Sequence, residues 1–223
     1  AEVLERAPFS FLVKEGAFST VASVTAGTVT VTNASTTVTE TTSNANGWSS
    51  TLVGYFFRAI GSNEFYEISA FGNANPDTIT LARAYEGTTA TLKTYEIFKR
   101  FYSLASDVRS LVNVFTGSGN TIQLQEVSQN DMDISFPNRP ELGNPANWAM
   151  AGVDSSNYRR IELYPVPDTA MGMYYRYVQA TPILASGATA IFPQVQVGLL
   201  RAGWLSDYWG WRAASSPNDT GIT

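Results

Sequence analysis

The sequence predicts an α+β fold in which a small helical bundle with antiparallel β-hairpins carries an inserted antiparallel β-sandwich or barrel-like domain. Residues 28–32 alternate strictly between threonine and valine, which is the period of a half-buried strand. Residues 193–212 carry apolar side chains at steps of three and four, which is the spacing of a helix. We therefore expect 1–19 and 98–223 to form one core domain and 20–97 to form the inserted β-domain.

The first segment, AEVLERAPFSFLVKEGAF, is typical of the tail of a helix that stops at Pro8, because a proline pushes the residue before it out of helical space. The next block is rich in threonine and other β-branched residues, which favour strands. Gly61-Ser62-Asn63 separates two of its runs and indicates a short hairpin. The strands expected in this block lie near 28–32, 35–42, 53–58, 64–68, 78–81 and 94–97.

After the β-domain we expect strands near 108–115 and 121–126 and then a short helix. Ser128-Gln129-Asn130-Asp131 resembles a capping box, in which side-chain oxygens satisfy free backbone N–H groups. The helix that begins there is expected to run to Phe136 and to stop before Pro137.

Residues 159–179, RRIELYPVPDTAMGMYYRYVQ, predict a β-hairpin, because two strand-like runs flank a Pro-Val-Pro-Asp turn. In the first run we expect Ile161 and Leu163 to face the core and Arg160 and Glu162 to face solvent. In the second run the alternation places one set of side chains on one face, Met173, Tyr175 and Tyr177, and another on the opposite face, Tyr174 and Arg176.

The last element is expected to be a helix that is apolar on two sides. A surface helix usually shows one apolar stripe, so the second side indicates burial against another subunit. One stripe consists of Val197, Leu200, Trp204, Tyr208 and Trp211, and the other of Val195, Leu199 and Ala202. The residues expected at a subunit or partner interface are Val197, Leu200, Arg201, Trp204, Tyr208, Trp211 and Arg212 of this helix, with Tyr174 and Arg176 of the hairpin.

Composition restricts the chemistry of the chain. The 223 residues include no histidine and no cysteine, which excludes the Ser–His–acid triad, thiolate chemistry, disulfides and histidine or cysteine metal sites. The net charge of −5 argues against sequence-independent nucleic-acid binding, although an acidic protein can still surround passing DNA. Only 15% of the residues are charged, against about 25% in typical soluble domains, which favours a surface partly hidden against partners. No apolar run approaches the roughly 20 residues that span a bilayer.

Two short motifs could carry chemistry, and each has a structural alternative. Ser118 lacks the flanking glycines of a nucleophile elbow, because Thr116 and Asn120 stand in their places, so a turn is the better interpretation. Asp131 and Asp133, the only close carboxylate pair in the sequence, could hold a hard cation or act as acid and base. Capping of the helix explains them better, since no glycine-bearing calcium loop follows.

Aromatic residues raise two further alternatives. The tyrosines of 173–177 could stack nucleic-acid bases, but the acidic net charge favours core packing and an interface. The aromatic stripe of Trp204, Tyr208 and Trp211 could line a ligand pocket, but a stripe on a helix is more often a packing surface. Both patterns therefore predict protein contacts.

Several segments follow one another in a recognisable order along the chain. They are FSFL at 9–12, the β-insertion, FYSLASDVR at 101–109, IELYPVPD at 161–168, YYRY at 174–177 and the terminal helix after Phe192-Pro193. This order resembles the neck proteins of tailed bacteriophages, specifically the head-to-tail adaptors similar to tail tubular protein A of short-tailed phages. The resemblance covers about 95–212 best, and its most telling part is the LYPxPD strand and turn followed by the tyrosine-rich strand.

The resemblance implies a non-enzymatic structural protein of the virion neck or tail, assembled in the host cytoplasm, with no cofactor and no metal. It implies a homo-oligomeric ring, commonly of twelve copies, that binds the phage portal protein and contacts tail or nozzle proteins. The β-domain at 20–97 is larger than a minimal adaptor needs, and it could contact tail fibres, a nozzle or a decoration layer. Double-stranded DNA would pass through the lumen without sequence-specific binding, and no membrane is involved. Two alternatives stay open: a carbohydrate-binding or depolymerising tail component, and another virion part such as a tail terminator or capsid decoration protein.

Overall fold

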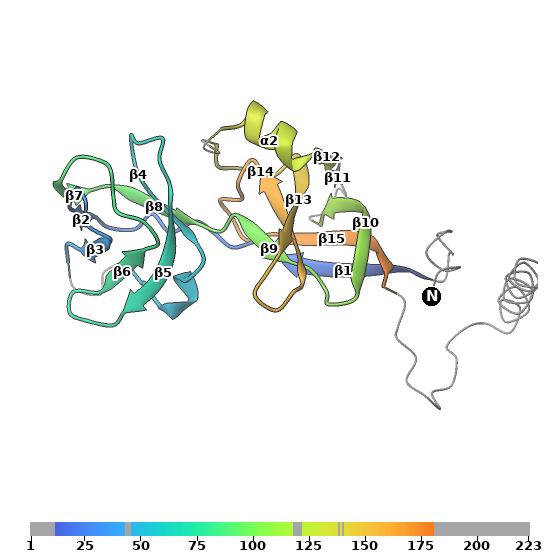
Figure 1. Cartoon of the computed structure of the whole chain (residues 1–223), viewed down its shortest axis with the longest axis horizontal. Coiled ribbons are helices and arrows are strands. Elements are labelled where there is room, and N and C mark those ends of the chain that lie inside the picture. The colour runs from blue at the N-terminus through green and yellow to red at the C-terminus, as the bar shows by residue number, and fades with distance from the viewer. Residues whose placement is uncertain (1–11, 43–45, 118–121, 138, 140, 181–223) are drawn as a thin grey trace, which may run out of the picture. The chain divides into compact units, whose positions relative to one another are not determined.

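A computed structural model describes residues 12–42, 46–117, 122–137, 139 and 141–180 (Figure 1). The chain divides into two compact units, and nearly all the described residues belong to the one that spans Lys14–Gln179. This unit is mostly β-strand, with one short α-helix, α2 (Gln129–Ser135), and a 3-10 turn, η2 (Ser50–Leu52). No helix among the described residues is long and apolar enough to cross a membrane.

The expected small helical bundle is therefore wrong, because antiparallel sheets including a half-closed barrel make up the structure. Between 98 and 180 the strand β15 alternates between buried and exposed residues, and the last four residues of β14 are all buried. Neither pattern has the spacing of a helix that buries one stripe. The helices expected before Pro8 and at 193–212 lie outside the described residues.

Seven strands form one antiparallel sheet from the first half of the chain (Figure 1). Their order across the sheet is β7 (Ala90–Lys93), β2 (Val29–Val31), β3 (Thr37–Glu40), β6 (Thr78–Leu81), β5 (Tyr66–Gly72), β4 (Phe56–Ala59) and β8 (Tyr95–Phe98). The strict alternation that predicted β2 is confirmed, since Val29 and Val31 are fully buried while Thr30 between them is half-buried. The hairpin predicted at Gly61-Ser62-Asn63 is also confirmed, because β4 and β5 pair antiparallel across it.

This sheet curls into a half-closed barrel. Val24, ahead of β2, forms an antiparallel bridge with Ile97 of β8, so the segment that enters the sheet also contacts its far edge. Tyr95 fixes this closure: its hydroxyl donates to the carbonyl of Ala26 at 2.8 Å and accepts from Nε1 of Trp48 at 2.9 Å. Burial raises the pKa of Tyr95 to about 12, so the hydroxyl stays protonated and able to donate at neutral pH.

The rest of the unit forms two four-stranded sheets that share one hydrophobic core. One sheet has the order β1 (Val13–Ser19), β15 (Gly172–Gln179), β10 (Val108–Thr116) and β11 (Ile122–Gln123). The other has the order β12 (Gln125–Glu126), β13 (Asn147–Val153), β14 (Arg159–Tyr164) and β9 (Phe101–Ser103). The buried residues between them include Tyr102, Val114, Trp148, Ile161, Leu163, Met173 and Tyr175, which come from both sheets as in a β-sandwich.

The predicted hairpin over 159–179 is wrong. Both runs are strands, but β14 pairs with β13 and β9, whereas β15 pairs with β10 and lies beside β1. The prolines end the first strand as expected, yet the segment after it is held elsewhere. The buried Val166 bridges Leu142, its N–H donates to the carbonyl of Glu141, and its carbonyl accepts from the N–H of Gly143. The chain therefore crosses from one sheet of the sandwich to the other.

Candidate interaction surface

Strand β15 presents two side chains to solvent at the positions that the sequence indicated. Tyr174 is 51% exposed and the side chain of Arg176 is 55% exposed. Their neighbours Met173, Tyr175 and Tyr177 are buried in the sandwich core. The predicted facing of this strand is therefore confirmed, because Met173, Tyr175 and Tyr177 pack in the core while Tyr174 and Arg176 between them face solvent.

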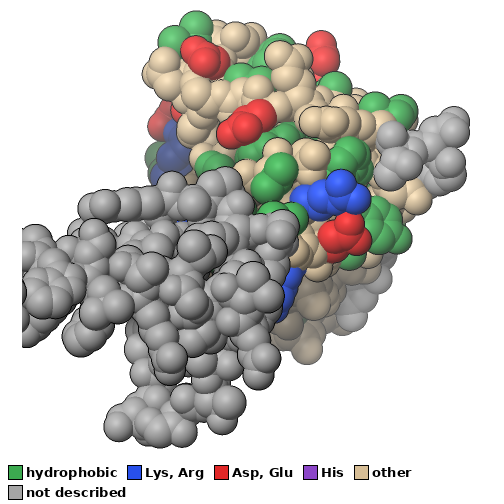
Figure 2. Space-filling model, turned by 90° about the vertical axis from the view of Figure 1, so that its right-hand side faces the viewer, with side chains coloured by type: hydrophobic (Ala, Val, Ile, Leu, Met, Phe, Trp, Pro, Cys, Tyr) green, Lys and Arg blue, Asp and Glu red, His purple; other side chains and the backbone are tan. Residues whose placement is uncertain are grey.

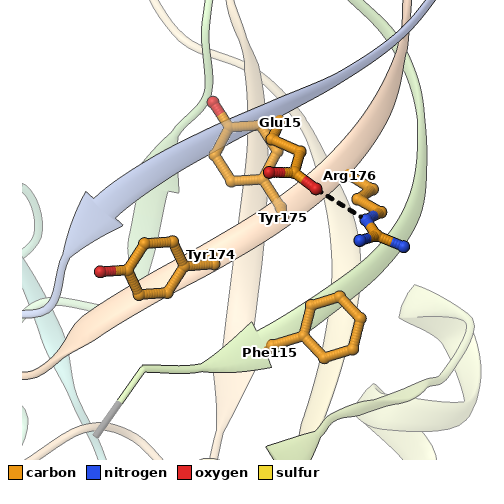
Figure 3. A pocket seen from close by; sticks show the side chains of 5 residues that line it. All are labelled: Glu15, Phe115, Tyr174, Tyr175 and Arg176. Carbon is orange, nitrogen blue, oxygen red and sulfur yellow. Dashed lines mark hydrogen bonds and ion pairs between the residues drawn. The ribbon is translucent and has the colours of Figure 1, made fainter. Parts of the chain in front are cut away.

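A groove of about 420 Å³ lies beside β15 and its neighbours β1 and β10. It is lined by Glu15 of β1, Phe115 of β10, and Tyr174, Tyr175 and Arg176 of β15 (Figure 3). Phe115 and Tyr174 are direct cross-strand partners, so two aromatic side chains stand next to each other on adjacent strands. The groove thus combines aromatic surface with one positive and one negative group.

Arg176 and Glu15 form the polar part of the groove. Nε of Arg176 donates to Oε1 of Glu15 at 3.0 Å, as the dashed line in Figure 3 shows. Both side chains are largely exposed, so the pair stabilises the fold by less than about 1 kcal/mol. The guanidinium can therefore exchange Glu15 for a carboxylate of a partner at little cost to the fold.

The ring of Tyr174 lies on the backbone at the end of β10. A Cβ added at Gly117 would lie 2.2 Å from Cε2 of Tyr174, so only glycine permits this close approach. Gly117 also donates from its N–H to the carbonyl of Gly172 at 2.8 Å, which ties the two strand ends together. Tyr174 is thus held in place by backbone and loses little freedom when a partner covers it.

The buried side of β15 is fixed by hydrogen bonds. The hydroxyl of Tyr175 accepts from the N–H of Ala105 at 3.1 Å, and the hydroxyl of Tyr177 donates to Oδ1 of Asp107 at 3.0 Å. Burial, together with the nearby Asp107 carboxylate, raises the pKa of Tyr177, so it remains a donor. A strand anchored in this way presents Tyr174 and Arg176 from a rigid support.

A buried ionic network lies around β14. The alternation of this strand predicts that Glu162 faces solvent, but its side chain is fully buried, so this prediction is wrong. Its carboxylate accepts from Nε of Arg139 at 2.6 Å, from Nε2 of Gln129 at 2.7 Å, and from Arg100. Burial opposes the charge on Glu162, but hydrogen bonds from Arg100 and Arg139 outweigh it and lower the pKa of Glu162 below its ordinary value.

The network continues into the seven-stranded sheet. Arg58 of β4 pairs with Glu96 of β8, and its Nη1 donates to the carbonyl of Arg139 at 3.2 Å. Arg139 also pairs with Asp133 and donates to the carbonyl of Met132 at 3.1 Å, which satisfies the end of α2. These charges therefore neutralise one another and tie α2, the sandwich and the barrel sheet together.

The carboxylate pair Asp131 and Asp133 has a structural role in this arrangement. Ser128 caps α2, because its hydroxyl accepts from the N–H of Asp131 at 3.0 Å, and it also donates to the Asp131 carboxylate. The N-cap at Ser128 is thus confirmed, and Asp133 pairs with Arg139. The described residues contain no group of three or more acidic side chains that could hold a metal ion.

The other residues expected at an interface fall on parts of the chain that the structure does not describe. They are Val197, Leu200, Arg201, Trp204, Tyr208, Trp211 and Arg212 of the expected terminal helix, and Ser118 of the expected turn also lies there. Glu15 and Phe115 lie beside Tyr174 and Arg176 in the groove, and neither was predicted from the sequence. The alternation of residues 108–115 could have indicated the facing of Phe115, but no local pattern marks Glu15 as its neighbour.

The surface shown in Figure 2 has a mixed character where it is not covered by grey atoms. Hydrophobic side chains stand there beside separate acidic and basic ones, and this uncovered part shows no broad area of one charge. Such a mixture is typical of protein–protein surfaces, whereas nucleic-acid surfaces carry basic stripes.

Comparison with known proteins adds no relative. No protein-family model, curated protein or solved structure matches this chain.

Proposed function

We propose that the chain is a structural subunit of a tailed-phage virion, an adaptor that assembles into a ring between the portal vertex and the tail. The observation that carries this proposal is the outer face of β15, where Tyr174 and Arg176 stand exposed beside Phe115 on a strand anchored from behind. Tyrosine and arginine are among the residues that contribute most to binding energy at protein interfaces. The order of motifs along the chain, which resembles that of phage adaptors, indicates that the partners are portal and tail proteins.

A ring requires that two different faces of the same subunit meet, since only such a heterologous contact closes around an axis. The groove is lined by Glu15 and Arg176 and carries both signs of charge, so it can receive a surface that offers a carboxylate beside an apolar side chain. In a ring of twelve copies the acidic net charge of the chain would let double-stranded DNA pass without binding it.

The buried network around Glu162 supports a binding role rather than a catalytic one. Its arginines and carboxylates pair with one another and with backbone carbonyls inside the protein. Such a network holds α2 and the sheets in a fixed arrangement, which a subunit under load in a virion requires.

The test is to measure the mass of the full chain in solution, alone and mixed with a phage portal ring. A stoichiometric complex with the portal, in a ring of identical copies, is the expected result. A stable monomer that does not associate with the portal at any ratio would overturn the proposal.

Carbohydrate binding is the second candidate, favoured by the exposed aromatic side chains and the Glu15 carboxylate in the groove. Sugars bind by stacking on aromatic faces and by hydrogen bonds to carboxylate and guanidinium groups. Retention of the chain on a polysaccharide column, abolished by Tyr174→Ser, would favour this role. A depolymerising role for Asp131 and Asp133 is not proposed, because capping and ion pairing engage both.

A further inference from the structure

Two carboxylates lie opposite each other inside the half-closed barrel. The register of β3 against β6 pairs Val38 with Ile79 and Thr39 with Thr78, so Glu40 comes to stand across from Asp77. The N–H of Glu40 donates to the carbonyl of Asp77 at 3.0 Å, which confirms this neighbourhood. Cβ atoms of such facing residues are about 4.5–5.5 Å apart, so the two side chains are in reach of each other.

Both carboxylates are inside the protein. Glu40 is 1% exposed and Asp77 is 5% exposed. Glu40 lies two residues after the buried Val38, and Asp77 lies two residues before the buried Ile79, so each faces the same side of its strand as that neighbour. Oε2 of Glu40 and Oδ1 of Asp77 are buried without a hydrogen-bond partner. The ion pairs found among the described residues involve neither of them.

Asn46 adds a further oxygen to this site. Its backbone N–H donates to Oε1 of Glu40 at 3.1 Å, which places the residue at the carboxylate. Asn46 is 5% exposed, and its Oδ1 lies against Gly27, where an added Cβ would be only 1.8 Å away. This Oδ1 also has no partner, and neither has the buried Oγ1 of Thr41, the residue after Glu40.

Three of these unsatisfied atoms, Oε2 of Glu40, Oδ1 of Asp77 and Oδ1 of Asn46, are carboxylate or amide oxygens that accept hydrogen bonds. Two facing carboxylates in a medium of low polarity repel each other, and buried charges are found paired or bound to metals. One proton shared by the carboxyl groups would leave the amide oxygen of Asn46 unsatisfied. A cation can take all three oxygens, because carboxylate and amide oxygens are the ligands that hard cations take.

We propose that Glu40, Asp77 and Asn46 bind one calcium ion where β3 ends beside the start of β6. Calcium accepts irregular sets of oxygen ligands, whereas magnesium demands near-ideal octahedral geometry, so a site built from two strands and a following segment suits calcium. The site lies on the barrel sheet, which the groove residues Glu15, Phe115, Tyr174 and Arg176 do not touch, so it stands independently of the adaptor role.

The first experiment is calorimetric titration of calcium chloride into the full chain in metal-free buffer. One ion per chain with Kd about 10⁻⁴–10⁻³ M is expected, the range of sites with few charged ligands. Calcium at about ten times Kd should shift the folding equilibrium roughly tenfold and raise the thermal midpoint by a few degrees over buffer with EDTA. Magnesium at the same concentration should have a smaller effect.

A second measurement uses the aromatic residues beside the site. Trp48 lies two residues after Asn46 along the chain, and its Nε1 donates to the hydroxyl of Tyr95 at 2.9 Å. Terbium, which replaces calcium at oxygen sites, should therefore show luminescence sensitised by Tyr95 or its partner Trp48. Calcium should displace the terbium and abolish that signal.

Matched variants separate a bound ion from a purely structural role. Glu40→Gln and Asp77→Asn should each weaken calcium binding at least tenfold. In EDTA each should raise the thermal midpoint, because the repulsion between the carboxylates is gone. Glu67→Gln on the exposed face of β5 removes the same charge and should leave calcium binding unchanged.

The proposal is overturned if neither calcium nor terbium binds the wild-type chain, or if binding survives in both variants. A midpoint that rises on acidification without any response to calcium would show a shared proton instead of a metal. If one variant fails to fold, the other and the terbium signal of the wild type still decide.

Discussion

The carboxylate of Glu162 accepts a hydrogen bond of 2.6 Å from Nε of Arg139, although the two side chains are 0% and 2% exposed. Arg100 and Gln129 complete the environment of the same carboxylate. A charge held so far from water is stable only while its partners are present, so the network determines how this unit responds to substitution and to acid.

Replacing Glu162 by glutamine should lower the free energy of unfolding by about 3–5 kcal/mol, because Arg100 and Arg139 then keep only the half-exposed Asp133 as a counter-charge. Urea denaturation of the purified chain at neutral pH measures this loss. Glu64→Gln is the control, since it breaks an exposed pair with Arg83 and should cost less than about 1 kcal/mol. Similar losses in both variants would contradict the structural role of the network.

The stability of the protein should fall in acid through Glu162. Its pKa is lower in the folded chain than its ordinary value of 4.5, so the folded state binds fewer protons than the unfolded state in that window. The contribution is fully present above about pH 4.5 and is lost as the pH falls through the lower folded value. Urea midpoints measured from about pH 7 down to about pH 3 should fall more steeply for the wild type than for Glu162→Gln. Parallel curves would show that another group controls acid stability.

Tyr174→Ser and Arg176→Ala should each weaken assembly with the partner at least about tenfold, because each removes an exposed anchor from the groove. The free energy of unfolding should change by less than about 1 kcal/mol, since both side chains are half-exposed and the Arg176–Glu15 pair lies in solvent. Sedimentation of the chain with portal rings measures the first quantity and urea denaturation the second. Ile134→Ser on α2 removes a side chain that is 70% exposed and should leave assembly intact. Equal weakening by this control would place the interface elsewhere.

Gly16→Ala should lower the free energy of unfolding by about 1–3 kcal/mol. A Cβ at Gly16 would lie 2.3 Å from Cζ of Tyr175, whose ring is buried and cannot swing away without losing its place in the core. Gly172→Ala is the matched control, because an added Cβ there meets nothing closer than 3.7 Å and should be neutral or slightly stabilising. Thermal unfolding of both variants tests the difference, and a neutral Gly16→Ala would mean that β1 does not approach Tyr175 so closely.

Part of the local structure of the described residues was readable from the sequence, although the strands β1, β7, β9 and β13 were not predicted. The threonine–valine alternation of 28–32, the Gly61-Ser62-Asn63 hairpin and the Ser128 cap each follow from contacts within a few residues, and each is confirmed. The outward facing of Tyr174 and Arg176 follows in the same way, because alternation along a strand is a property of the strand itself.

The partners of the strands were decided by the tertiary structure. Residues 159–179 carry the pattern of a hairpin, yet β14 and β15 belong to different sheets. The segment between them is held by Val166, which forms a bridge with Leu142 and donates its N–H to the carbonyl of Glu141. The expected helical bundle failed for a related reason, since a pairing of distant strands satisfies the backbone as fully as a helix does.

The burial of charge could not be read from the chain either. Alternation assigned Glu162 to solvent, but β14 has protein on both faces, and arginines far away in the sequence, Arg100 and Arg139, compensate its charge. Glu40 and Asp77 likewise become neighbours only through the register of β3 and β6. The sequence by itself determined where several of the strands lie and which side chains alternate along them, because these depend on neighbours along the chain. The tertiary structure alone decided which charges meet, because this depends on pairing between segments that are distant along it.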